Sequence, residues 1–112
     1  MTSAVSDTGP LLHLTEAHVL EILHRIDSVC APPQVVTELG YLWSGWQTPA
    51  WIKVDRLDEF HAAEADAWVQ AELLHPGEAE AIALARQVGA DWLLTDDSAA
   101  RLFAGELGLE VH

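Results

Sequence analysis

Four short apolar runs, separated by longer segments of helical composition, constrain what this chain can fold into. They are "SAVSD", "DSVCAPP", "WIKVDRL" and "DWLLT", at residues 3–7, 27–33, 51–57 and 91–95. Strands that alternate with helices of about 10 to 15 residues are typical of a parallel sheet covered by helices on both faces. We therefore predict an α/β fold of three layers, α/β/α, around a central parallel sheet. A length of 112 residues with 50% hydrophobic composition suits a single domain, residues 1–112.

Five helices are expected between and after these strands. The first should run from Pro10 to His24, and the second should begin in "PPQVVTEL". The third covers "DEFHAAEADAWVQAELL" and ends at "HPG". The fourth is "GEAEAIALARQVGA", closed by Gly89, and the fifth is "SAARLFAGELG", closed by Gly105 or Gly108. The aromatic, turn-rich segment from residue 40 to residue 50 predicts a loop.

The charge of the chain limits its partners. There are 18 acidic residues against 5 Lys and Arg, which gives a formal net charge of -13. This argues against a general coat for nucleic acid, because such proteins bind phosphates through Lys and Arg. A protein this acidic acts on a polyanion only if a divalent metal neutralises its site or a basic partner supplies the missing charge.

The expected location and the single cysteine follow from equally simple patterns. There is no run of about 20 apolar residues and no signal-peptide pattern, so we predict a cytoplasmic protein without membrane contact. Cys30 cannot form an internal disulfide and is expected to be a small buried residue.

Acidic residues follow the predicted strands at the edge where ligands bind in parallel sheets. Asp7 ends the first strand, and Asp96 and Asp97 follow the fourth. Glu38 lies on the helix after the second strand, and "GEAEA" places acids in the first turns of another helix. Carboxylates brought together in this way repel one another and raise their own pKa values unless a cation neutralises them. Oxygen ligands suit Mg²⁺ or Mn²⁺, and such ions support hydrolysis of phosphodiester bonds.

Each acid also has a simpler interpretation. Asp7 can be a turn residue ahead of a helix, and Glu38 can be a solvated helix residue. Either Asp96 or Asp97 can cap the following helix, a role that can coexist with metal binding. Arg101 is expected to form a salt bridge with Asp97.

The aromatic residues and histidines are less specific. Trp43, Trp46 and Trp51 cluster in and after the predicted loop, either as core anchors or as a partner-binding patch. The six histidines show no spacing typical of zinc sites.

Four segments together resemble a known family. "VSDTGPLLHL", "APPQVVTEL", "GEAEAIALARQVGADWLLTDDSAAR" and "LGLEV" are similar, in order and spacing, to the PIN-domain nucleases, and most closely to the prokaryotic toxin-like branch related to VapC toxins. The resemblance covers nearly the whole chain, and residues 77–101 are its most specific part. It implies a Mg²⁺- or Mn²⁺-dependent endoribonuclease that cleaves RNA. It also implies the toxin of a type II toxin-antitoxin pair, restrained by a basic antitoxin, and a homodimer.

The resemblance assigns site residues by position. The implied catalytic acids are Asp7, Glu38, Glu78 and Asp97, and these four with Asp96 are the implied metal ligands. Glu80 lies close enough to Glu78 to be kept as its alternate. Acids two residues apart point in different directions around a helix, so both are not expected to reach one metal. Thr8 and Thr95 match small hydroxyl positions that orient a carboxylate or a water.

Other functions remain as alternatives. Members of this branch usually continue past the final strand, whereas this sequence stops at His112, so a C-terminally shortened fold is expected. Together with the scarcity of basic residues, this motivates the alternative of a non-catalytic PIN-like module that binds a protein. A receiver-like domain is disfavoured because it would place paired acids after the first strand and a lysine after a late one. No Gly-x-Gly-x-x-Gly motif indicates dinucleotide binding.

Overall fold

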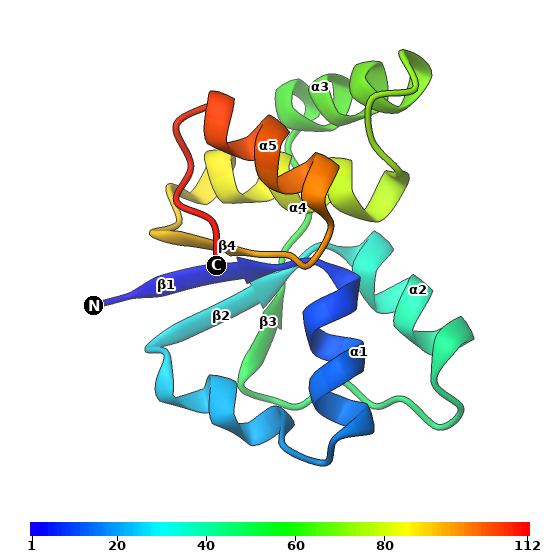
Figure 1. Cartoon of the computed structure of the whole chain (residues 1–112), viewed down its shortest axis with the longest axis vertical. Coiled ribbons are helices and arrows are strands. Elements are labelled where there is room, and N and C mark those ends of the chain that lie inside the picture. Colours follow the sequence, from blue (N-terminus) through cyan, green and yellow to red (C-terminus); the bar gives the residue numbers. More distant parts are fainter.

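The computed structural model describes residues 1–112 and contains a four-stranded parallel sheet (Figure 1). The strands are β1 (Ser3–Ser6), β2 (Ser28–Ala31), β3 (Ile52–Val54) and β4 (Trp92–Leu94). Their order across the sheet is β3-β2-β1-β4, and every neighbouring pair is parallel. The predicted α/β fold with a central parallel sheet is therefore confirmed.

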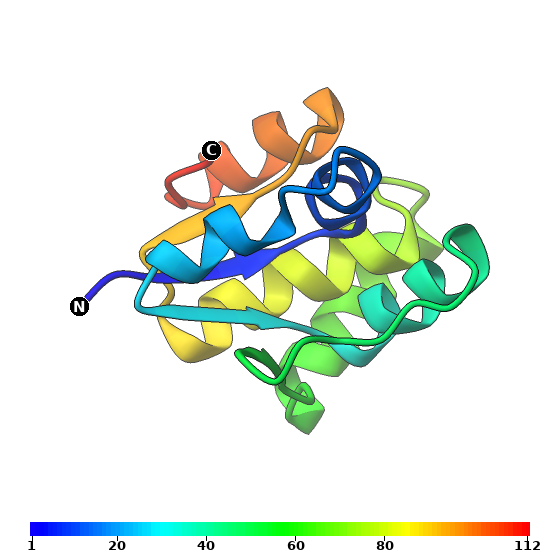
Figure 2. The ribbon, with the colours of Figure 1, turned by 90° about the horizontal axis from the view of Figure 1, so that it is seen from below.

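Helices cover both faces of this sheet. They are α1 (Thr8–Glu16), α2 (Pro33–Leu42), α3 (Glu59–Gln70), α4 (Pro76–Val88) and α5 (Ser98–Glu106), with a 3₁₀ helix, η1 (Leu20–Arg25). In Figure 1, α3, α4 and α5 lie above the sheet, whereas α1 and η1 lie below it. Figure 2 shows the same layers from below, with α1 and η1 nearest the viewer. No helix is both long enough and apolar enough to cross a membrane.

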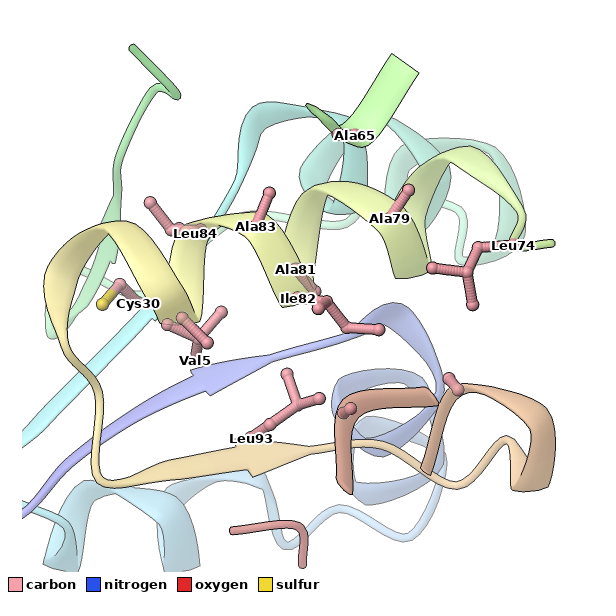
Figure 3. Close-up of a cluster of buried hydrophobic side chains, with 13 residues drawn as sticks. Val5, Cys30, Ala65, Leu74, Ala79, Ala81, Ile82, Ala83, Leu84 and Leu93 are labelled. Atoms are coloured by element: carbon pink, nitrogen blue, oxygen red, sulfur yellow. The ribbon is translucent and has the colours of Figure 1, made fainter. Parts of the chain in front are cut away.

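Successive residues of the strands point to opposite faces of the sheet and pack into two separate hydrophobic clusters. Val5, Cys30 and Leu93 point toward α4, where they pack with alanines and Ile82 (Figure 3). The opposite face of the sheet contributes Val29, Ala31 and Ile52, which pack with residues of α1 and α2. This alternation is the period of two that a strand with both faces buried requires.

Cys30 lies in the core, and Trp46 and Trp51 pack against it. Burial raises the pKa of the Cys30 thiol to about 11, as expected for a small buried residue rather than a reactive one. Trp46 and Trp51 are half-buried and pack against the cluster formed with α1 and α2, which favours core anchoring over a partner-binding patch. Trp43 is also half-buried.

The prediction of one helix from Pro10 to His24 is wrong. Helix α1 ends at Glu16, and η1 begins only at Leu20. His18 takes a positive φ of 59°, and the Val19 N–H donates to the carbonyl of Leu14 at 2.9 Å. This is the hydrogen-bond pattern of a helix stop that usually places glycine where His18 stands.

Helix α3 also stops before its predicted end. It was expected to reach Leu74 but ends at Gln70, because Glu72 takes φ 59° and the Leu73 N–H donates to the carbonyl of Trp68 at 3.0 Å. Here again a non-glycine residue occupies the left-handed position.

The remaining helix ends lie close to expectation. Helix α4 is closed by Gly89, as predicted. Helix α5 ends at Glu106, and Gly108 takes the positive φ. Helix α2 extends to Leu42, into the segment predicted as a loop. The last residues run beside β4, where Val111 forms a parallel bridge with Leu93.

Candidate functional site

An acidic pocket lies at the carboxyl ends of β1 and β4. The chain places β2 and β3 on one side of β1 and β4 on the other, so the strand order reverses here, and ligands of α/β sheets bind at such points. The pocket has a volume of about 410 Å³. Its lining residues, called the acidic pocket below, are Asp7, Thr8, Gly9, Leu12, His13, Glu38, Leu42, His75, Glu78, Asp96 and Asp97. The five acids assigned as metal ligands from the sequence therefore lie around one pocket, and Glu80 does not line it.

Asp7 is the most enclosed acid of the acidic pocket, with 5% of its surface exposed. Its Oδ1 accepts the Thr8 N–H at 2.7 Å, which caps α1, and its Oδ2 accepts the Thr95 hydroxyl at 3.1 Å. Burial raises the pKa of Asp7 despite these two hydrogen bonds, and the negative charges of Glu38 and Asp96 raise it further. Asp7 therefore both caps α1 and lines the acidic pocket.

Glu38 reaches the acidic pocket from α2 because a glycine leaves room for it. Its Oε1 accepts the Thr8 hydroxyl at 2.6 Å, and Oε2 accepts the Gln34 amide at 3.4 Å. A Cβ atom at Gly77, in the first turn of α4, would collide with the Glu38 carboxylate. Gly9 leaves similar room for Asp96. Sequence reasoning missed both glycines, although each lies close to a predicted acid, in "DTG" and "PGE".

Glu78 and Glu80 point into different spaces, as their helical spacing requires. Oε1 of Glu78 accepts the His75 N–H at 3.0 Å, which caps the start of α4. Burial raises the pKa of Glu78, and the charge of Asp97, a hydrogen bond with it and the charge of Asp7 add to the effect. Glu80 instead lines a separate pocket that includes Arg56, where burial also raises its pKa.

The two adjacent aspartates have different partners. Asp97 caps α5 by accepting the Ala100 N–H at 2.8 Å, so the predicted cap is confirmed for this residue. Asp96 is exposed, and its Oδ2 lies 2.8 Å from Nδ1 of His13.

The predicted salt bridge between Arg101 and Asp97 is wrong. The Arg101 guanidinium donates to the carbonyl of Thr95 at 3.3 Å and makes no ion pair. The capping carboxylate of Asp97 turns back over the first turn of α5 and already accepts a backbone donor there.

Comparison with known proteins agrees with this geometry. The chain matches the family described as PIN domain over residues 3–112. The chain belongs to the PIN-domain family. No curated protein matches it. PIN domains are generally nucleases that act on nucleic acids, so the acidic pocket lies in a fold of the nuclease type.

The donor set of this PIN domain fits a hard divalent cation. Carboxylates surround the acidic pocket, and no Lys or Arg lines it, so His13 and His75 are its only side chains able to carry positive charge. No three acidic, histidine or cysteine side chains are close enough together to hold one ion as they stand. Neighbouring hydroxyl, amide and backbone donors hold Asp7, Glu38, Glu78 and Asp97 around the pocket without neutralising them. Oxygen donors of this kind suit Mg²⁺ or Mn²⁺.

Proposed function

We propose that this PIN domain is a Mg²⁺- or Mn²⁺-dependent endoribonuclease that hydrolyses RNA phosphodiester bonds. One observation carries the proposal: acids from four separate segments line a single pocket at the edge where the strand order reverses. The raised pKa values of Asp7 and Glu78 support it, because shifts of this kind are common among the acids of functional sites. Burial is the larger cause of both shifts, and neighbouring carboxylates raise both pKa values further.

The residues of the chain divide into ligands and supports. Asp7, Glu38, Glu78 and Asp97 would hold the ion, with Asp96 as a further ligand. A bound divalent ion would offset charge on the phosphate and make a water molecule more acidic. Thr95 fixes the orientation of Asp7, and Thr8 fixes that of Glu38. Burial raises the pKa of Glu78, and metal ligands must be deprotonated, so metal binding should strengthen as the pH rises through that pKa.

We further propose that the protein is the toxin of a type II toxin-antitoxin pair that acts in the cytoplasm. The net charge of -13 favours a basic antitoxin, whose Lys or Arg side chains would complement the acidic pocket. A homodimer is part of the proposal, since exposed apolar side chains such as Phe60 and Leu102 are available to be covered by a second copy.

A cleavage assay tests the nuclease. Purified protein is incubated with a fluorescently labelled, single-stranded RNA and either Mn²⁺, Mg²⁺ or a chelator. We expect cleavage only with metal, and a loss of at least about 100-fold in Asp7→Asn, since the missing carboxylate would anchor the ion. Asp66→Asn is the matched control, because Asp66 is exposed on α3 and lines a different pocket. Cleavage that persists with the chelator, or undiminished in Asp7→Asn, would refute the proposal.

The alternative is a non-catalytic module that binds a protein. It is favoured by the lack of a closely grouped ligand set and by the scarcity of Lys and Arg. Calorimetry with Mn²⁺ separates the two functions. The nuclease requires binding at millimolar metal that Asp7→Asn weakens, whereas the module requires none.

A further inference from the structure

A second depression opens directly beside the acidic pocket. It has a volume of about 290 Å³ and is called the side hollow here. His75, Glu78 and Asp97 line both the side hollow and the acidic pocket, so the two spaces are adjacent. A volume just below the range of about 300 to 1,000 Å³ that holds drug-sized ligands suits one small ring system.

The walls of the side hollow are mostly apolar. They are formed by Val69, Leu73, Leu74, Pro76 and Ala99. Leu74 is buried, whereas Leu73 is 54% exposed although it is a large apolar side chain. His75 lines both the side hollow and the acidic pocket. No Lys or Arg lines the side hollow, so it has no side chain with a permanent positive charge for a phosphate.

Glu72 lines the side hollow from an uncommon backbone conformation. Its φ of 59° is held by the Glu72 N–H, which donates to the carbonyl of Val69 at 2.9 Å, and by the neighbouring turn that ends α3. A non-glycine residue in the left-handed region costs on the order of 1 kcal/mol and often marks a functional site. Glu72 and Leu73, which follow one another in this turn, both line the side hollow.

We propose that the side hollow binds one unpaired nucleobase of the RNA strand whose phosphate occupies the acidic pocket, and that it prefers guanine. This inference rests on the proposed nuclease function. Apolar walls and a flat imidazole ring accept the face of a base, as in other sites that hold a base removed from its stack. The polar side chains other than His75 are those of Glu72, Glu78 and Asp97, which only accept hydrogen bonds when they are ionised.

The preference for guanine follows from the edge that each base presents. Guanine places two N–H donors, N1 and the N2 amino group, side by side, which matches the two oxygens of the Glu72 carboxylate. Uracil offers a single donor, N3–H, between two carbonyl oxygens, so it makes one hydrogen bond and brings a carbonyl oxygen close to the other oxygen of the carboxylate. Adenine and cytosine offer an amino donor next to an acceptor, so each makes only one favourable bond.

The test maps cleavage sites on a long RNA by sequencing the 5′ ends of the products. Wild-type protein with Mn²⁺ should cut beside unpaired bases, with guanine enriched at one fixed position next to the cut. Glu72→Gln should lower that enrichment about tenfold, because one bidentate pair to a base contributes on the order of a tenfold or larger discrimination. Glu106→Gln, on α5 and outside the hollow, is the control that should keep the wild-type pattern.

Kinetics on one short RNA that contains the preferred site test the stacking. Leu73→Ala and His75→Ala should each raise KM about tenfold while kcat changes by less than about twofold, since base stacking contributes to binding of the strand. His75→Phe should restore the KM, because a flat ring is kept. A merely structural role for His75 would not be rescued in this way.

The outcomes separate this inference from the proposed function. If wild-type protein cleaves RNA but shows no base preference, or if Glu72→Gln and Leu73→Ala leave the preference and KM unchanged, the subsite is refuted and the nuclease stands. If wild-type protein does not cleave RNA, the nuclease is refuted. In that case NMR titration with the dinucleotides GpG and UpU tests the hollow: shifts at Val69, Leu73 and Ala99 with GpG alone support it, and their absence refutes it.

Discussion

Thr95 lies 88 residues after Asp7 in the sequence, yet its hydroxyl donates a hydrogen bond of 3.1 Å to Oδ2 of Asp7. The two residues follow adjacent parallel strands, and the Asp7 N–H in turn donates to the carbonyl of Leu94 at 2.9 Å. Both residues are buried. The orientation of Asp7 in the acidic pocket therefore depends on Thr95, which follows β4, the last strand in the sequence.

Replacing Thr95 by valine should affect both stability and the site. Valine keeps the shape of threonine but cannot donate to Asp7, so we expect a loss of about 1 kcal/mol in the free energy of unfolding. Mn²⁺ affinity should fall as well, because Asp7 loses its orientation. Thr37→Val is the control, since the Thr37 hydroxyl donates only to the carbonyl of Pro33 on the exposed side of α2. Equal effects of the two substitutions in urea unfolding and calorimetry would contradict the assigned role of Thr95.

Asp7→Asn should make the protein more stable at neutral pH when no metal is present. The pKa of Asp7 is raised in the folded state, so the folded protein binds a proton there more tightly than the unfolded chain does. Stability is therefore lost as the pH rises from the ordinary carboxyl value of 3.8 through the folded pKa, at about 1.4 kcal/mol per unit of pKa difference. Asparagine does not titrate. Urea unfolding between pH 4 and pH 8 should show a smaller decline for Asp7→Asn.

The decline should not vanish in Asp7→Asn, because Glu78 and Glu80 also have raised pKa values. Saturating Mn²⁺ should reverse the ranking, since a ligand that binds only the folded state stabilises it. Identical pH profiles for the two proteins would show that burial of Asp7 has no energetic cost.

Gly77→Ala should damage the site while leaving the fold intact. The added methyl group would occupy the space of the Glu38 carboxylate and displace it from the acidic pocket. We expect Mn²⁺ affinity to fall at least about tenfold, as for loss of a supporting contact around a metal. Gly40→Ala is the matched control, because nothing lies within 4 Å of a Cβ there. That change should stabilise α2 by about 0.5–1 kcal/mol without altering metal binding. A wild-type affinity in Gly77→Ala would contradict the proposed ligand position of Glu38.

Two substitutions at Asp97 should separate its cap from its charge. Asparagine is a good N-cap, so Asp97→Asn should keep a melting temperature close to that of the wild type but bind Mn²⁺ more weakly. Asp97→Ala should lose metal affinity and, in addition, about 1 kcal/mol of stability. If Asp97→Asn binds Mn²⁺ as the wild type does, Asp97 serves only as a cap.

Much of the fold and the location of the acids could be predicted because both depend on simple periodic rules. Strands alternating with helices indicate a parallel sheet, and the carboxyl ends of its strands share one edge. Asp7 and Asp97 could be placed at that edge from their positions after two apolar runs. Glu78 could be preferred to Glu80 on family spacing, and the structure shows why only one acid of that pair faces the acidic pocket: they project from different sides of α4.

The features that were missed depend on single backbone conformations or on contacts across space. The stops at His18 and Glu72 use left-handed residues that are not glycine, so no local signal marks them. Gly77 leaves space for the carboxylate of Glu38, and this contact could not be predicted because the two residues are far apart in the sequence. Arg101 was expected to pair with Asp97, four residues earlier in the sequence. Asp97 instead caps α5, and Arg101 donates to the carbonyl of Thr95.

The burial of α4 limits how far the wall that it contributes to the acidic pocket can move. Its alanines together with Ile82 and Leu84 are buried, and the same helix begins with Gly77 and Glu78 at the acidic pocket. A close-packed helix cannot shift by even part of a turn without opening voids in the core, at a cost of several kcal/mol. An inhibitor that distorts the floor of the pocket would have to supply that energy. An inhibitor that only blocks the mouth of the pocket does not displace α4 and needs none of this energy. We therefore expect blocking of the mouth to be the easier way to inhibit such a domain.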